Sequence, residues 1–247
     1  MQPINLQAVR AYIEEHIGPD FHEKKIEKLR LLTVETILKR KNPYLFRAKG
    51  AVTANDLIES VLDATVSSGE ETVFGSFLER LAIYVCGKTH QGKKSSATGL
   101  DLEFSWDGKH YIVTIKSGPN WANSDQRKKM EANFTKVKKT LRTSGGLAKT
   151  EIVAIEGCCY GKDDSPDKGE YQKLCGQRFW SLISGRPNLY RDLIEPLGMH
   201  ARERNEALLE LRAQKLNMFT QRFLTDYCND GAIDWEKLVH YNSGAAT

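Results

Sequence analysis

The sequence contains no run of 18 or more apolar residues, so we expect no membrane-spanning helix. The N-terminal residues lack the apolar stretch of a secretory signal peptide. Cysteine is scarce and odd in number, and without a secretory signal we expect the five cysteines to be reduced thiols. These absences argue against a membrane protein and against a secreted disulfide-bonded protein. We therefore expect a cytoplasmic protein with no membrane partner.

Zinc-ligand spacing is also missing from the chain. The six histidines are scattered and form no ligand pair. Cys158, Cys159 and Cys175 lack the Cys-x2-Cys spacing of structural zinc sites. We interpret these cysteines as buried thiols near a substrate-binding loop.

What the chain does contain is an ordinary globular composition with one basic segment. The 247 residues are 40% hydrophobic and 28% charged, enough for one large domain or two small ones. The formal net charge is only +4, yet residues 109–149 hold ten lysines and arginines against two acids. A local basic excess favours a polyanionic partner, although a solvated basic helix has the same composition.

Hydrophobic periodicity predicts helices at both ends of the chain. The expected helices cover residues 4–17, 21–41, 53–64, 71–86, 124–142, 172–183, 199–227 and 234–239. A short element is expected at residues 190–194, a polar loop at 87–96, a helix stop at 144–146, and a loose tail at 243–247. The first 66 residues show no catalytic pattern. We predict a mainly helical region at 1–66, serving as scaffold, dimer surface or an arm that embraces the polyanionic partner, and a core with long C-terminal helices at 67–247.

Residues 98–123 predict a tight β-hairpin. Asp107 and Gly108 suit a type I′ turn, which needs positive φ at both central positions. Folding at this turn pairs Trp106 with Lys109 and Leu102 with Val113. Side chains alternate along strands. One predicted face is therefore apolar (Leu100, Leu102, Phe104, Tyr111, Val113 and Ile115). The other carries Asp101, Glu103, Ile112, Thr114 and Lys116.

A helix and a second apolar strand follow the hairpin. Residues 124–142 predict the helix, and residues 151–156 a buried strand. A helix that joins two strands of one sheet places them in parallel. The expected class is α/β, with a sheet core flanked by helices.

The polar face of the hairpin matches the layout of a PD-(D/E)xK nuclease. Such enzymes place an acid on one strand and an acid-x-Lys sequence on its partner. The carboxylates hold Mg²⁺, and the lysine assists a water or stabilises charge. Asp101 and Lys116 fit, but Thr114 replaces the second acid. The alternative is an edge hairpin with a solvated polar face.

Several segments together resemble the PmeII family of type II restriction endonucleases. They are residues 98–123, 154–162, 174–185 and 233–239. This resemblance implies a restriction-endonuclease-like mixed sheet. It also implies a homodimer that cuts both strands of double-stranded DNA at a short palindrome, using Mg²⁺. A bacterial or archaeal cytoplasm and a cognate DNA methyltransferase, as a genetic partner, follow from the same resemblance.

The resemblance assigns Asp101 as a metal ligand and Lys116 as the catalytic lysine. The second acid stays open: Glu79 and Glu103 are ranked above Glu131. Thr114 can act through its hydroxyl, or the Ile115 carbonyl can bind the metal, because Mg²⁺ accepts mixed oxygen ligands.

Candidate DNA contacts lie downstream of Lys116, where a helix N-terminus can receive a phosphate. They are Asn120, Asn123, Ser124, Gln126, Arg127 and Lys128, together with Tyr160 and Lys162. Helix capping and solvation are the alternative roles for these side chains. Two other functions stay open: a non-catalytic DNA-binding module with a degenerate nuclease core, and a structure-specific nuclease such as a repair nuclease or a Holliday-junction resolvase.

Overall fold

The predicted hairpin is the centre of the sheet. In the computed structural model, which describes residues 1–143 and 146–245, β2 (Leu102–Trp106) and β3 (Lys109–Lys116) are antiparallel. Leu102 pairs with Val113 and Trp106 with Lys109, so the predicted register is confirmed. The turn residues Asp107 and Gly108 have φ of 51° and 71°, as a type I′ turn requires.

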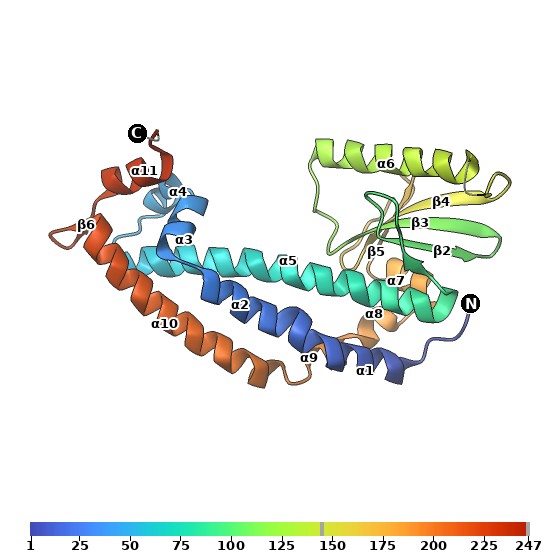
Figure 1. Ribbon diagram of the computed structural model, residues 1–247, viewed down its shortest axis with the longest axis horizontal. Helices are drawn as coiled ribbons and strands as arrows, with labels where there is room; N and C mark the ends of the chain where they lie inside the picture. The colour runs from blue at the N-terminus through green and yellow to red at the C-terminus, as the bar shows by residue number, and fades with distance from the viewer. Residues whose placement is uncertain (144–145, 246–247) are drawn as a thin grey trace. The chain divides into compact units, whose positions relative to one another are not determined.

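Three further strands complete a mixed sheet in the order β1-β2-β3-β4-β5 (Figure 1). β1 (Lys93–Lys94) is antiparallel to β2, whereas β4 (Glu151–Cys158) and β5 (Gln172–Cys175) run parallel to β3. The crossover from β3 to β4 contains α6 (Ser124–Thr143). The predicted α/β class, with a restriction-endonuclease-like mixed sheet flanked by helices, is confirmed.

Helix α6 covers one face of this sheet (Figure 1). The apolar residues buried between them are Leu100, Ile112, Met130, Phe134, Val137, Ile152, Ala154 and Tyr171. The predicted placement of Leu100 on the face opposite Ile112 is therefore wrong. Leu100 and Asp101 precede β2, so the alternation of a strand does not apply to them.

The other face is covered by α7 (Gln177–Ser184) and the end of α5 (Ala54–His90). Phe179 of α7 is fully buried against Gly157 of β4, where an added Cβ would overlap its ring. The Thr89 hydroxyl of α5 donates to the Ile183 carbonyl of α7 at 2.6 Å. These contacts fix both helices against the sheet.

The prediction of two helices at 53–64 and 71–86 is wrong, because α5 is one continuous helix over both segments. Residues 65–69, which lie between the two predicted helices, are weak helix formers. Val66 and Val73, however, pack into apolar surroundings, so tertiary packing outweighs local propensity. The helix also runs to His90, into the expected loop at 87–96.

The N-terminal region is more broken than predicted. Helix α1 (Leu6–Ile17) is followed by a π-helical turn, η1 (Gly18–Glu23), then by α2 (Lys24–Leu31) and α3 (Val34–Arg40). The expected single helix over 21–41 is interrupted because Thr33 is extended and its hydroxyl accepts from the Thr36 amide. The short helix α4 (Pro43–Ala48), capped by Asn42, was not predicted.

The C-terminal region contains the expected long helix, α10 (Ala201–Tyr227). The predicted helix over 172–183 is partly wrong, because its first residues form β5 and only α7 is helical. Short helices α8 (Leu189–Asp192) and α9 (Ile194–Gly198) precede α10. Strands β6 (Cys228–Asn229) and β7 (Ala232–Ile233) and helix α11 (Trp235–Ser243) follow it. The predicted helix stop at Ser144 and Gly145 and the tail residues 246–247 lie outside the described residues.

The chain forms two compact units. The sheet unit comprises Met1–Ile17 and Phe74–Met199, and the helical unit comprises Gly18–Val73 and the described residues from His200 on. The helical unit has its own apolar core, which includes Ile37, Leu57 and Phe223. The division of the chain at residue 66 stays a prediction. None of the helices in residues 1–143 and 146–245 is long and apolar enough to cross a membrane.

We expect Gly157→Ala to lower the free energy of unfolding by about 1–3 kcal/mol, because the new methyl group must displace the buried Phe179 ring. The matched control is Gly198→Ala in α9, where an added Cβ meets nothing within 4 Å. Urea denaturation of the full chain measures both variants. Equal stability of the two would contradict the described packing of α7 on β4.

Candidate active site

Asp101 is held against the end of strand β3. Its Oδ2 atom accepts a hydrogen bond from the Ile115 amide at 2.6 Å and another from the Thr114 hydroxyl at 3.2 Å. The Asp101 amide also donates to the Val113 carbonyl at 2.9 Å. Thr114, which stands where the second acid of the nuclease layout was expected, is buried and donates its proton to Asp101.

Lys116 ends the same strand and is half-buried. Its Nζ atom lies 4.6 Å from the centre of the Trp121 ring, a cation–π distance. Strand β3 thus delivers the Asp101 contacts and the Lys116 ammonium to one end of the sheet.

Glu79 reaches this site from α5. Burial raises the pKa of Glu79, and the negative charge of Asp101 raises it further, whereas Lys94 and Lys116 act in the opposite direction. The Lys94 Nζ atom lies 3.9 Å from Glu79 Oε1. Gly75 of the same helix faces Ser117, since a Cβ built on the glycine would lie 3.4 Å from Ser117 Cβ. Glu79 is therefore close enough to Asp101 and Lys116 for their charges to shift its pKa.

The other candidate acids have different partners. Glu103 accepts a hydrogen bond from the Ser95 hydroxyl and lies 3.5 Å from His110 Nε2. Glu131 is on α6, near Tyr171. The pKa of Tyr171 is raised to about 12, mainly by burial, and the negative charge of Glu131 adds to this shift. Which of the three acids acts as the second acid stays a prediction.

Three residues that the sequence did not single out support the lysine. The Trp121 indole donates to Glu156 Oε1 at 2.8 Å, and the Lys173 ammonium lies 3.3 Å from the same oxygen. Lys173 also donates to the Pro119 carbonyl at 2.8 Å. Glu156 is 2% exposed and lies opposite Thr114 in the β3–β4 register. Of these three residues, only Glu156 had a signal in the sequence, because it is an acid at the end of the predicted apolar strand.

The candidate DNA contacts are exposed and gather in two adjoining segments. The Tyr160 amide donates to the Ser117 carbonyl at 3.1 Å, and the Tyr160 ring occupies the space where a Cβ of Gly118 would be. Lys162 follows in the same loop. Asn120, Ser124, Arg127 and Lys128 are exposed near the start of α6.

Two of these candidates have a capping role in the structure. The Asn123 side chain accepts from the Gln126 amide at 3.0 Å, and the Gln126 side chain accepts from the Asn123 amide at 3.0 Å. This reciprocal pair is a capping box, which satisfies free amides at the start of α6. Their part in DNA binding stays a prediction.

The donor chemistry of this site suits a hard divalent cation. Mg²⁺ is usually held by one or two carboxylates, with waters and substrate phosphate completing the shell. The Glu79 and Asp101 carboxylates form such a set. Within residues 1–143 and 146–245, no cluster of three or more His, Cys, Asp or Glu side chains suits a metal. Cys158, Cys159 and Cys175 are buried, as predicted, and burial raises the pKa of each thiol.

The five-stranded mixed sheet flanked by helices is consistent with a restriction-endonuclease-like fold. A family model described as type II restriction endonuclease EcoO109I matches residues 7–205, more than three quarters of the chain. The chain belongs to this family, and is therefore a nuclease that acts on DNA. A search of curated proteins found no match. The expected class is confirmed, whereas the closer resemblance to PmeII stays a prediction.

We expect Glu79→Gln to raise the melting temperature by a few degrees at about pH 8 in EDTA, and by less at about pH 4. The pKa of Glu79 is raised in the folded state, so its ionisation opposes folding as pH rises above the unfolded value. Glutamine keeps the shape and removes that cost. A melting temperature that falls at both pH values would contradict the described surroundings of Glu79.

We expect Lys173→Met to lower the free energy of unfolding by about 3 kcal/mol, because Glu156 would stay buried without its cation. Adding Glu156→Gln should recover part of the loss, since glutamine still accepts from Trp121. Lys109→Met, which breaks an exposed pair with Glu151, is the control and should change little. Additive effects of Lys173→Met and Glu156→Gln in urea denaturation would show that the two side chains do not interact.

Proposed function

We propose that this protein is a type II restriction endonuclease that hydrolyses phosphodiester bonds in both strands of DNA at a short palindromic sequence. The observation that carries the proposal is the grouping of Glu79, Asp101 and Lys116 at the end of β3. These residues come from a helix, the segment before β2 and strand β3, and they combine two carboxylates with one ammonium. The family to which the chain belongs supports the same reaction.

In this proposal Asp101 and Glu79, with the Ile115 carbonyl, would hold a Mg²⁺ ion. The ion supplies a Lewis acid for the scissile phosphate and lowers the pKa of a bound water. Asp101 is oriented for this task, because the Ile115 amide and the Thr114 hydroxyl hold one carboxylate oxygen and leave the other for a ligand. Glu103 and Glu131 are the weaker candidates for the second acid.

Lys116 stabilises the negative charge that develops on the phosphate or helps to orient the attacking water. Trp121 positions the lysine, because its ring lies under the ammonium group and its indole is anchored on buried Glu156. Thr114 keeps its hydroxyl hydrogen bond to Asp101 and adds no charge.

DNA would lie over the exposed segments that adjoin the site. Arg127 and Lys128 at the start of α6 supply positive charge, and Tyr160 and Lys162 lie in the loop after β4. Asn120, Ser124, Asn123 and Gln126 are the candidates for contacts to base edges or backbone. A palindromic site favours a two-fold symmetric homodimer. We propose a cytoplasmic location, with a cognate methyltransferase as the genetic partner.

A non-catalytic DNA-binding module is the second candidate, and one observation favours it. Thr114 occupies the position of the second acid, so the acid-x-Lys sequence is incomplete. Cleavage would then require that the Glu79 carboxylate, which comes from α5, binds the metal together with Asp101.

We expect wild-type protein with Mg²⁺ to cut plasmid DNA into discrete fragments, and Asp101→Asn and Lys116→Met to slow this cutting by at least roughly 100-fold. The matched controls are Asp107→Asn, in the turn of the same hairpin, and Lys109→Met, on the same strand. Both should cut normally. Agarose gels measure the fragments, and gel shift in EDTA measures DNA binding.

Intact plasmid with every divalent cation, combined with a normal gel shift, would overturn the nuclease proposal in favour of the binding module. Cutting without a preferred sequence would favour the structure-specific nuclease. Unchanged cutting by Asp101→Asn would show that the metal ligands lie elsewhere.

A further inference from the structure

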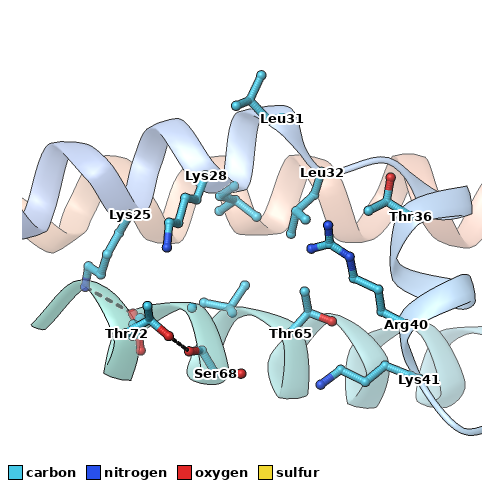
Figure 2. A pocket seen from close by; sticks show the side chains of 14 residues that line it. Lys25, Lys28, Leu31, Leu32, Thr36, Arg40, Lys41, Thr65, Ser68 and Thr72 are labelled. Atoms are coloured by element: carbon cyan, nitrogen blue, oxygen red, sulfur yellow. Dashed lines mark hydrogen bonds and ion pairs between the residues drawn. The ribbon is translucent and has the colours of Figure 1, made fainter. Parts of the chain in front are cut away.

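A basic cavity lies within the helical unit, which contains none of the predicted cleavage residues. Its volume is about 510 Å³, and its walls are α2 and α3 on one side and the middle of α5 on the other (Figure 2). Four basic residues line it, Lys25, Lys28, Arg40 and Lys41, against the single acid Glu70. The lining therefore has a surplus of positive charge.

Two of the four cations have partners inside the protein. The Lys25 ammonium lies 3.1 Å from Glu70 Oε1 and donates to Asn205 Oδ1 at 3.1 Å. The Lys41 ammonium donates to the Ala64 carbonyl at 3.0 Å. Glu70 already pairs with Lys25, so the lining has no further acid to balance the positive charges of the other basic residues.

Lys28 and Arg40 are the unbalanced pair. Within the part of the chain that the structure describes, neither side chain makes a hydrogen bond or an ion pair. Figure 2 shows Lys28 extending from α2 toward α5, and the Arg40 guanidinium reaching into the space between the helices. Two cations directed into one cavity repel each other and attract an anion.

The α5 wall leaves room for such an anion. Ser68 and Gly69 lie on this wall, and the Ser68 hydroxyl has no partner among the described residues. A Cβ built on Gly69 meets no atom within 4 Å. Gly69 therefore faces open space on this wall.

We propose that this cavity binds a phosphate group. The Arg40 guanidinium offers paired donors that match phosphate oxygens, and Lys28 adds a point charge. Ser68 supplies a neutral donor from the opposite wall. The phosphate can come from a DNA backbone or from a free phosphate compound, since both present the same oxygens. This inference goes beyond the proposed function, because phosphate binding does not require cleavage.

The test is calorimetric titration of the full chain with inorganic pyrophosphate. We expect one site, weakened roughly tenfold or more in the double variant Lys28→Gln/Arg40→Gln, because two charged hydrogen-bond donors are lost. Gly69→Leu, which fills the cavity without changing the charge, should weaken binding similarly. The control Arg202→Gln/Lys237→Gln removes the same charge from exposed positions of the same unit and should bind normally.

Equal pyrophosphate binding by wild type, the Lys28→Gln/Arg40→Gln variant and Gly69→Leu would overturn the proposal, as would no binding by wild type. A second arm identifies the source of the phosphate. DNA affinity is measured in EDTA at several salt concentrations. A salt slope lower by about 1 for each lost contact in the double variant indicates a DNA phosphate. An unchanged slope with lost pyrophosphate binding indicates a free phosphate compound.

The nuclease proposal is tested separately by Asp101→Asn. This variant keeps the cavity, so it should bind pyrophosphate as wild type does. Failure of cleavage with intact pyrophosphate binding therefore concerns the nuclease proposal alone.

Discussion

The candidate site depends on the hydrogen bonds between Asp101 and strand β3. Asp101 lies before β2, where no regular strand ladder fixes its side chain. The Asp101 amide bonds to the Val113 carbonyl, and the bonds from the Ile115 amide and the Thr114 hydroxyl hold one carboxylate oxygen at the end of β3. Because Lys116 ends the same strand, a single stretch of backbone sets the distance between acid and lysine.

Around this stretch, charged groups are buried only where they are paired. Glu156 and Lys173 are almost fully buried, and each also bonds to the segment that follows β3, through Trp121 and the Pro119 carbonyl. A buried pair of this kind contributes little net stability, but it disfavours any arrangement that leaves one charge alone. It therefore fixes the course of the chain between Lys116 and α6.

The sequence was sufficient for features that depend on local rules. The Asp107-Gly108 turn fixed the hairpin register, and the register placed Asp101 beside Thr114. The sequence was insufficient for features that depend on packing between residues far apart in the chain. Helix α5 continues through residues 65–69 because Val66 and Val73 make apolar contacts. Leu100 was assigned to the wrong face because it lies before β2, where strand alternation does not apply. Trp121, Glu156 and Lys173 come from three segments, so no spacing along the chain could reveal their network.

The threonine at position 114 has a consequence for tracing such enzymes in genomes. A search keyed to the acid-x-Lys signature would pass over this chain, because a hydroxyl stands where the signature demands a carboxylate. The Thr114 hydroxyl nevertheless bonds to the Asp101 carboxylate and helps to hold it against β3. Sequences with a threonine at this position are therefore better sought through the hairpin and the helix beside it than through the acid-x-Lys signature.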